Sequence, residues 1–422
     1  MKKRLIIGCC MMATAVMTAS AQSSTKSPYS QFGIGILSDR SQGMSRGMNG
    51  VGIALQQSNI VNTMNPASYG SVDSLTMIFD ASVTGQMTNF KEGNTQQNAK
   101  TANFDYIVAS FRAWRNVGVS VGVLPLSNVG YSYQTTSTVN QEYGKLAETY
   151  SGEGGLHEAF IGFGWRILKP LSIGVNAGYV WGDLDRSVLT ANSNFGSLMK
   201  SYSTSVKSYK LDVGMQWRQP LNRNNVVTLG ATMGIGHKLN ADPKLDIINV
   251  SKSDTTSYQI SNGMELPWSM GVGLAWQHRD KLTIAADAEL QQWGKTSFPT
   301  YVNNTYTSTK DIMKDRLSLK VGAEWVPDAN DVRHYLKRVH YRFGAGLSTP
   351  YYKINGQDGP KDISVSAGFG LPIQNAYNSR SIVNISGQWV HSSAKDFITE
   401  NMFRINIGIT FNERWFAKWK VE

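Results

Sequence analysis

The stretch LSIGVNAGYVW, residues 171–181, alternates apolar side chains with small or polar ones along its whole length. Successive side chains of a β-strand point to opposite faces, so one face here is apolar from Leu171 to Trp181. That face ends in Tyr179 and Trp181, and aromatic residues at the end of an apolar face are typical of strands in membrane β-barrels. The stretch therefore predicts a strand with one face in lipid and one in a polar interior.

The same alternation recurs from Leu75 to Phe411. The predicted strands are Leu75–Thr84, Asn103–Arg112, Val117–Val123, His157–Trp165, Leu171–Trp181, Tyr209–Trp217, Val227–Ile235, Leu266–His278, Leu282–Leu290, Leu317–Trp325, Val339–Leu347, Ile363–Leu371, Val383–His391 and Phe403–Phe411. Fourteen is an even number, as a closed antiparallel barrel requires, and closure removes the strand edges that lipid cannot hydrogen-bond. The sequence predicts an all-β fold, a 14-stranded antiparallel transmembrane β-barrel over residues 74–411, followed by a C-terminal tail over residues 412–422.

The connections alternate in length, which supports the barrel independently. Outer-membrane barrels join their strands by short periplasmic turns and longer outer loops. Ala113–Asn116, Arg166–Pro170 and Arg279–Lys281 belong to the shorter set. The longer set includes Gly85–Ala102, Leu124–Leu156 and Gly182–Tyr202, which we expect to be outer loops; a soluble all-β protein has no reason to sort its loops in this way.

The N-terminus reads as a secretory signal over residues 1–21. Lys2, Lys3 and Arg4 form its basic end, and Ala19-Ser20-Ala21 forms the cleavage site before Gln22. Cys9 follows a short apolar run like that of a lipoprotein, but cleavage there leaves an apolar core of about four residues, below the roughly 7 to 15 that a signal needs. We expect an exported protein of the outer membrane, processed through a cleaved signal peptide.

Both cysteines, Cys9 and Cys10, lie in the signal, so the mature chain is expected to have no disulfide. The formal charge of +11 includes three basic residues of the signal, and the remaining Lys and Arg are scattered without forming a run. Such scattering argues against nucleic acid as a partner and favours the phosphates of outer-membrane lipids.

The stretch GMSRGMNGVGIALQQSNIVNTMNPA, residues 43–67, has small and apolar residues but neither a helical nor a strand period. Because it precedes the whole series of strands, we interpret residues 22–73 as an N-terminal extension and hatch inside the lumen. Asn65, Pro66 and Ala67 stand immediately before the first strand.

With this plug, the Asn-Pro-Ala motif, the strand number and the loop order, the chain resembles the FadL/TodX family of outer-membrane transporters from about Ser41 to Phe411. The resemblance implies a monomer and an internal hatch carrying Asn65, Pro66 and Ala67. It also implies passive movement of hydrophobic small molecules or lipids, such as long-chain fatty acids. The barrel-assembly machinery is a further implied partner. Trp415, Phe416 and Trp419 in the tail leave open whether this machinery recognises Phe411 or the tail.

The third predicted strand is followed by LPLSNVGY, residues 124–131. Proline cannot donate to a ladder, so pairing must stop or bend at Pro125. In the FadL/TodX family a kink in the third strand opens the wall beside the hatch, which gives Pro125 and Gly130 a candidate role. The alternative is a strand that simply ends in an outer loop.

Other chemistry is not indicated. The six histidines have no ligand partner at metal-binding spacing, and no nucleophile motif is present, so we expect no metal, no cofactor and no enzyme activity. The alternative function is a barrel accessory or shuttle protein of an outer-membrane secretion and surface-attachment system, which binds protein cargo and passes no solute. A continuous apolar cavity favours transport, whereas a lumen filled with charge favours the accessory.

Overall fold

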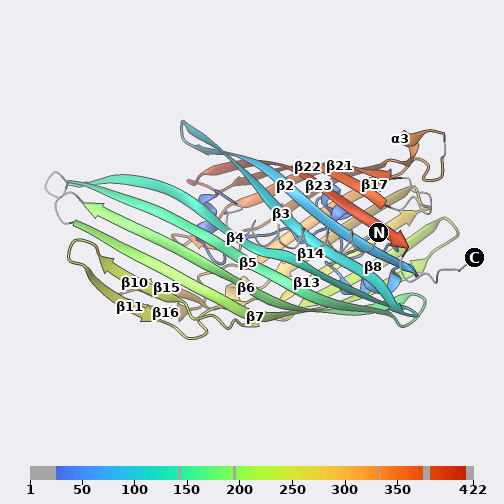
Figure 1. Cartoon of the computed structure of the whole chain (residues 1–422). Helices are drawn as coiled ribbons and strands as arrows, with labels where there is room; N and C mark the ends of the chain where they lie inside the picture. Colours follow the sequence, from blue (N-terminus) through green and yellow to red (C-terminus); the bar gives the residue numbers. More distant parts are fainter. Residues whose placement is uncertain (1–24, 141–143, 193–195, 332, 374–380, 415–422) are drawn as a thin grey trace, which may run out of the picture.

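The computed structural model describes residues 25–140, 144–192, 196–331, 333–373 and 381–414. Its wall is a closed, 14-stranded antiparallel barrel (Figure 1). The wall strands are β2 (Thr76–Glu92), β3 (Thr95–Trp114), β4 (Val117–Asn140), β5 (Gly144–Arg166), β6 (Leu171–Asn192), β7 (Gly196–Pro220), β8 (Asn225–Gly234), β13 (Ser269–His278), β14 (Leu282–Gln291), β17 (Arg316–Trp325), β18 (His340–Ser348), β21 (Lys361–Ile373), β22 (Ser381–Ser393) and β23 (Thr399–Arg414). Each pairs with its neighbours, and β23 closes the ring on β2 from Thr76↔Arg414 to Lys91↔Thr399.

The predicted strand number and phase are confirmed. On β6, the side chains of Ile173 and Val175 are 39% and 38% exposed and face outward, whereas Asn176 is 1% exposed and faces the lumen. Each predicted strand overlaps one wall strand. The predicted signal over residues 1–21 and the end of the predicted tail lie outside the described residues, and β23 continues past Phe411 to Arg414.

The predicted outer loops after the first, third and fifth barrel strands are wrong, because the described residues of these segments are strand, apart from the turn at residues 93–94. The ladder of β6 and β7 runs without interruption from Leu171↔Trp217 to Asn192↔Gly196. Beyond the bilayer a strand needs no apolar face, so the alternation fades while the backbone hydrogen bonds continue. In Figure 1, β4 to β7 reach far past the rest of the wall on one side.

Smaller elements gather at this outer end. β10 (Lys244–Asn249) pairs with the extension of β7 and with β11 (Asp254–Gln259). The others there are β9 (His237–Lys238), β12 (Glu265–Leu266), η3 (Trp293–Lys295), β15 (Phe298–Val302), β16 (Thr305–Thr309), β19 (Lys353–Ile354) and β20 (Gln357–Asp358). The opposite end carries the short turns and α3 (Tyr335–Arg338), which makes it the periplasmic end (Figure 1).

The N-terminal segment, residues 25–75, contains η1 (Pro28–Gln31), β1 (Ile36–Leu37), α2 (Gly43–Gly47) and η2 (Pro66–Ser71). Its residues are largely buried, and its hydrogen bonds reach lumen-facing side chains on both sides of the ring, such as Asp287 on β14 and Tyr106 on β3. The segment therefore lies within the barrel. Over the ranges that the structure describes, no helix has the length and apolar character needed to cross a membrane.

Candidate functional site

The Asn-Pro-Ala motif anchors the N-terminal segment to one side of the wall. The side chain of Asn65 is fully buried; its oxygen accepts a hydrogen bond from the backbone N–H of Ala67 at 3.1 Å, which caps η2. Its amide nitrogen donates to the carbonyl of Ile53 at 2.7 Å and to that of Met215 on β7 at 3.2 Å. Pro66 supplies the fixed φ that suits the first position of a helical turn. The motif thus joins two parts of the segment to the barrel.

The strands beside this motif place glycines against it. Five lumen-facing glycines on the consecutive strands β4 to β8 lie so close to the N-terminal segment that an added Cβ would overlap its backbone or the Asn65 side chain. We call these five glycines the glycine seat: Gly118, Gly164, Gly174, Gly214 and Gly230. Only a residue without a Cβ permits such an approach. The seat therefore fixes the position of residues 53–69 on the wall.

The opposite wall receives α2 in the same way. Gly322 and Gly344 touch the backbone of Met48. A Cβ added to Gly368 would lie 3.0 Å from the Cα of Gly47. Nearby, the carboxylate of Asp287 accepts hydrogen bonds from the backbone N–H groups of Gly52 at 2.6 Å and Ile53 at 2.9 Å. The segment spans the lumen from wall to wall.

Filling any seat glycine should dislodge the segment. We expect Gly174→Val to cost about 3 kcal/mol, the upper end for overpacking, because the clash is with the backbone of Pro66 and cannot be relieved by a side-chain rotation. The readout is tryptic cleavage after Arg40 and Arg46, which should become fast. Gly85→Val is the matched control, since a Cβ at Gly85 meets nothing within 4 Å. Equal cleavage of the two variants would contradict the seat.

Two groups of charges tie the segment to the strands. Arg40 lies 3.4 Å from the carboxylate of Glu158 on β5 and 3.1 Å from that of Asp212 on β7. Lys210 pairs with both of these carboxylates. Buried carboxylates require such partners, because an unpaired charge in a closed interior is strongly unfavourable.

The second group surrounds Arg46. Its guanidinium lies 3.3 Å from the carboxylate of Asp105 on β3 and donates to the carbonyl of Ser41 at 3.1 Å. Burial alone would raise the pKa of Asp39, but the positive charges of Arg46 and Lys320 lower it to about 2, so Asp39 stays ionised. Alternation puts Glu158, Lys210 and Asp212 on the lumen face of their strands, but it does not show which charges pair, and Arg40, Arg46 and Asp39 lie in the N-terminal segment.

The wall separates at Pro125. The last ladder pair between β3 and β4 toward the outer end is Ile107↔Val123, and over the described length of both strands none follows it. The register of β4 against β5 shifts between Pro125 and Ser127, yet β4 continues to Asn140, so the alternative of a strand ending in a loop is wrong.

The N-terminal segment covers the free edge of β4. Ile36 of β1 pairs with Asn128 of β4. Gly130 does not lie at the register shift; its backbone N–H donates to the hydroxyl of Ser30 at 3.0 Å, and that hydroxyl lies 3.2 Å from its carbonyl. Pro125 therefore lies at the register shift, and Gly130 hydrogen-bonds to the N-terminal segment.

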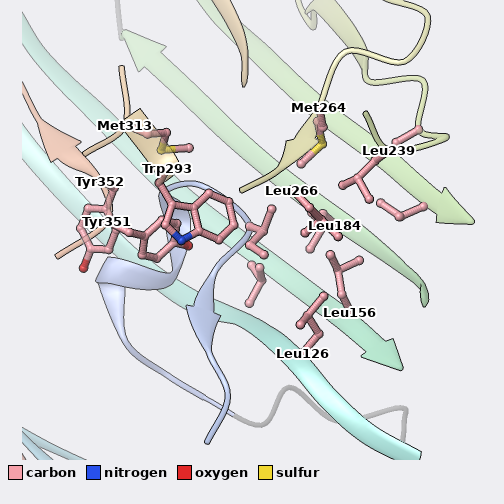
Figure 2. Packing of buried hydrophobic residues seen from close by; sticks show 14 of the residues in the cluster. Leu126, Leu156, Leu184, Leu239, Met264, Leu266, Trp293, Met313, Tyr351 and Tyr352 are labelled. Atoms are coloured by element: carbon pink, nitrogen blue, oxygen red, sulfur yellow. The ribbon is translucent and has the colours of Figure 1, made fainter. Parts of the chain in front are cut away.

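A cluster of apolar side chains lies above the charges, toward the outer end. It joins Tyr29 and Ile34 of the N-terminal segment to aromatic residues of the outer elements, among them Trp293 and Tyr351, whose ring centroids are 4.8 Å apart. Figure 2 shows Trp293, Tyr351 and Tyr352 next to the segment, with Leu126, Leu156 and Leu184 along the strands. Periodicity does not reveal this cluster, because its members come from segments far apart in the chain.

Two cavities lie on opposite sides of the segment. The outer cavity, about 280 Å³, borders the apolar cluster and the charged groups of the lumen. The periplasmic cavity has a volume of about 810 Å³, and residues 56–59 of the segment line it. Over the part of the chain that the structure describes, no group of three or more His, Cys, Asp or Glu side chains is arranged to hold a metal ion.

Comparisons with known proteins agree on the architecture. The toluene transporter TodX of Pseudomonas putida has a TM-score of 0.63 with 14% identity, over 90% of this chain and 100% of that chain. The toluene transporter TbuX of Ralstonia pickettii has a TM-score of 0.60 with 13% identity, over 89% and 99%. A FadL homologue of Pseudomonas aeruginosa has a TM-score of 0.61 with 11% identity, over 89% and 99%. At these identities the likeness shows the fold, and it confirms the resemblance at that level.

Sequence comparison gives one match. A family model described as BamG matches residues 1–422. No curated protein matches the chain.

Proposed function

The chain belongs to the BamG family, and from this premise we propose that it is an outer-membrane channel for hydrophobic small molecules that carry a polar end, such as long-chain fatty acids. The N-terminal segment acts as its hatch. The observation that carries the proposal is the outer cavity, which combines apolar and aromatic side chains with charged side chains of both signs. The structural neighbours named as toluene transporters are consistent with a hydrophobic solute.

The chemistry of the outer cavity suits an amphipathic solute. Tyr29, Leu126 and Trp293 are among its apolar lining residues, and Arg316 and Arg404 are among its five cations, which share the lining with five carboxylates. A carboxylate would pair with a guanidinium while the hydrocarbon chain packs against the aromatic rings. The volume of about 280 Å³ is near the lower limit of roughly 300 Å³ for ligand sites, so the site accepts one slender molecule.

The exit in this proposal is the separation of β3 and β4. Pairing of β4 with β3 ends two residues before Pro125, and β1 of the N-terminal segment covers the edge of β4 that this leaves. If the segment moves, the covered edge opens beside the outer cavity. The ion pairs of Arg40 and Arg46 must then break, whereas the Asn65 anchor on the glycine seat stays in place.

Uptake of radiolabelled palmitate into cells tests the proposal. Deleting residues 41–64 removes α2 and the Arg46 pair, so we expect faster palmitate uptake and new leakage of small polar solutes. Replacing Asn65 and Pro66 with Ala removes the anchor and should change palmitate uptake while the barrel assembles normally. Glycine variant Gly85→Val serves as the control for expression and assembly. Unchanged uptake and unchanged leakage at normal barrel levels would overturn the hatch and the channel.

The accessory function stays a second candidate because the centre of the lumen is filled with charge. Arg40 pairs with Glu158 and Asp212 inside the barrel, and Arg40 and Asp212 line the outer cavity itself. In an accessory protein the segment would be a permanent plug. Deletion of residues 41–64 would then produce leakage without any change in palmitate uptake.

A further inference from the structure

The periplasmic cavity is not used by the proposed transport of hydrophobic molecules. It opens at the short-turn end of the barrel, below the N-terminal segment, and has a volume of about 810 Å³. Its floor is formed by residues 56–59 and Ser71 of the segment. Its walls come from the ends of β5, β7 and β13 and from the turns that follow them.

The walls carry more positive charge than negative. Four cations line the cavity: Arg166, Lys169, Arg218 and Lys281. Among the described residues, none of the four forms an ion pair within 4.0 Å. Of the lining carboxylates, Glu324 is already paired with Arg342 at 2.6 Å, which leaves Asp280 alone against four cations.

The backbone positions that carry the cations are spread along the wall. Arg166 ends β5, Arg218 lies near the end of β7, and Lys281 lies in the turn between β13 and β14. The strand order is β5, β6, β7, β8, β13, β14, with neighbouring strands about 4.8 Å apart, so this row extends over roughly 20 Å. A single phosphate cannot reach along such a row, whereas an extended peptide of about six residues can.

The cavity also carries amide side chains. Gln56, Gln57, Asn59, Gln219 and Gln277 line the same cavity, and each offers both a donor and an acceptor to a peptide backbone. Arg218 is held in place, because it donates to the carbonyl of Gln56 at 3.0 Å and to the side-chain oxygen of Gln277 at 3.2 Å. Its remaining N–H groups are left for a ligand carboxylate.

We propose that the periplasmic cavity binds an extended, acidic peptide segment of a protein in the periplasm. The carboxylates pair with the row of cations, and the peptide backbone hydrogen-bonds to the amide side chains. Lipid headgroups reach the outer face of the barrel, whereas this cavity lies inside its mouth and faces the periplasm.

Fluorescence anisotropy of the purified full-length protein in detergent tests the proposal. The probe is a fluorescein-labelled eight-residue peptide of alternating Glu and Ser, and the comparison peptide has Gln in place of Glu. The test variant combines Arg166→Gln, Lys169→Gln and Lys281→Gln. The matched control combines Arg115→Gln, Arg223→Gln and Arg279→Gln, which removes three exposed charges from the same end of the barrel outside the cavity. Heat-modified migration in gels verifies that both variants are folded.

We expect the Glu peptide to bind the native protein, the test variant to weaken that binding at least tenfold, and the control to change it less than threefold. Binding should fall steeply with salt, because exposed and partly exposed charges are screened. Equal losses in the two variants, or equal binding of the Gln peptide, would overturn the proposal. Displacement by tripolyphosphate at lower concentration than by unlabelled Glu peptide would identify a small-anion site and also overturn it. None of these readouts depends on palmitate uptake.

Discussion

Arg342→Leu is expected to lower the free energy of unfolding of the barrel by about 3 to 5 kcal/mol, the range for removing one partner of a buried ion pair. Arg342 is 2% exposed. Its Nε donates to the carboxylate of Glu324 at 2.6 Å, and its Nη1 donates to the side-chain oxygen of Asn384 at 2.5 Å. The variant leaves Glu324 buried with His340, at 3.1 Å, as its ion-pair partner among the described residues. Folding titrations in detergent micelles measure the change.

Two controls isolate the buried charge as the cause. Lys314→Leu breaks an exposed ion pair with Asp358, whose side chains are 38% and 48% exposed, and should cost at most about 1 kcal/mol. The double variant Arg342→Leu with Glu324→Leu removes both charges and should recover most of the loss, because no unpaired charge stays buried. A double variant as unstable as Arg342→Leu would show that lost packing, and not the stranded carboxylate, causes the effect.

Val175→Arg is expected to cost roughly 2 to 4 kcal/mol, the value for a cation on the lipid face near the bilayer midplane. Val175 faces outward on β6, where its side chain is 38% exposed, and it lies midway between Leu171 and the girdle residue Tyr179. A guanidinium at this depth loses its hydration shell, which destabilises the folded barrel. The same titration as above, performed in lipid vesicles, measures the change.

Val175→Leu is the matched control and should cost less than about 1.5 kcal/mol, since one apolar side chain replaces another on a surface without a fixed neighbour. A similar cost for Arg and Leu would mean that this face does not contact hydrocarbon. That result would reverse the inside and outside of β6 and, through the shared ladder, of its neighbours β5 and β7.

Alternation along the strands was enough to predict the wall. The face that holds Val175 is apolar because lipid offers no hydrogen bonds, and the face that holds Asn176 is polar because it meets the segment inside. Gly344 alternates onto the lumen face in the same way, and there it lies against Met48. These are local properties, since each is repeated every second residue.

The expectation of outer loops failed because alternation marks only the part of a strand that faces lipid. Strands such as β6 continue to Asn192 beyond the alternating region, because backbone hydrogen bonds need no particular side chain. Pro125 left two outcomes open, and the choice between a bend and a strand end depended on whether β5 remained beside β4.

The sequence by itself determined the strands, their phase, the number needed for closure and the position of the Asn-Pro-Ala motif before the first of them, because these follow from periodicity and local backbone chemistry. Only the tertiary structure decided which residues meet in the lumen. Closing the ring brings Arg40 to Glu158 and Arg46 to Asp105, and it places Gly174 under Pro66. Such pairs are far apart in the chain, and their geometry is fixed by strand register and barrel curvature, which alternation along one strand does not encode.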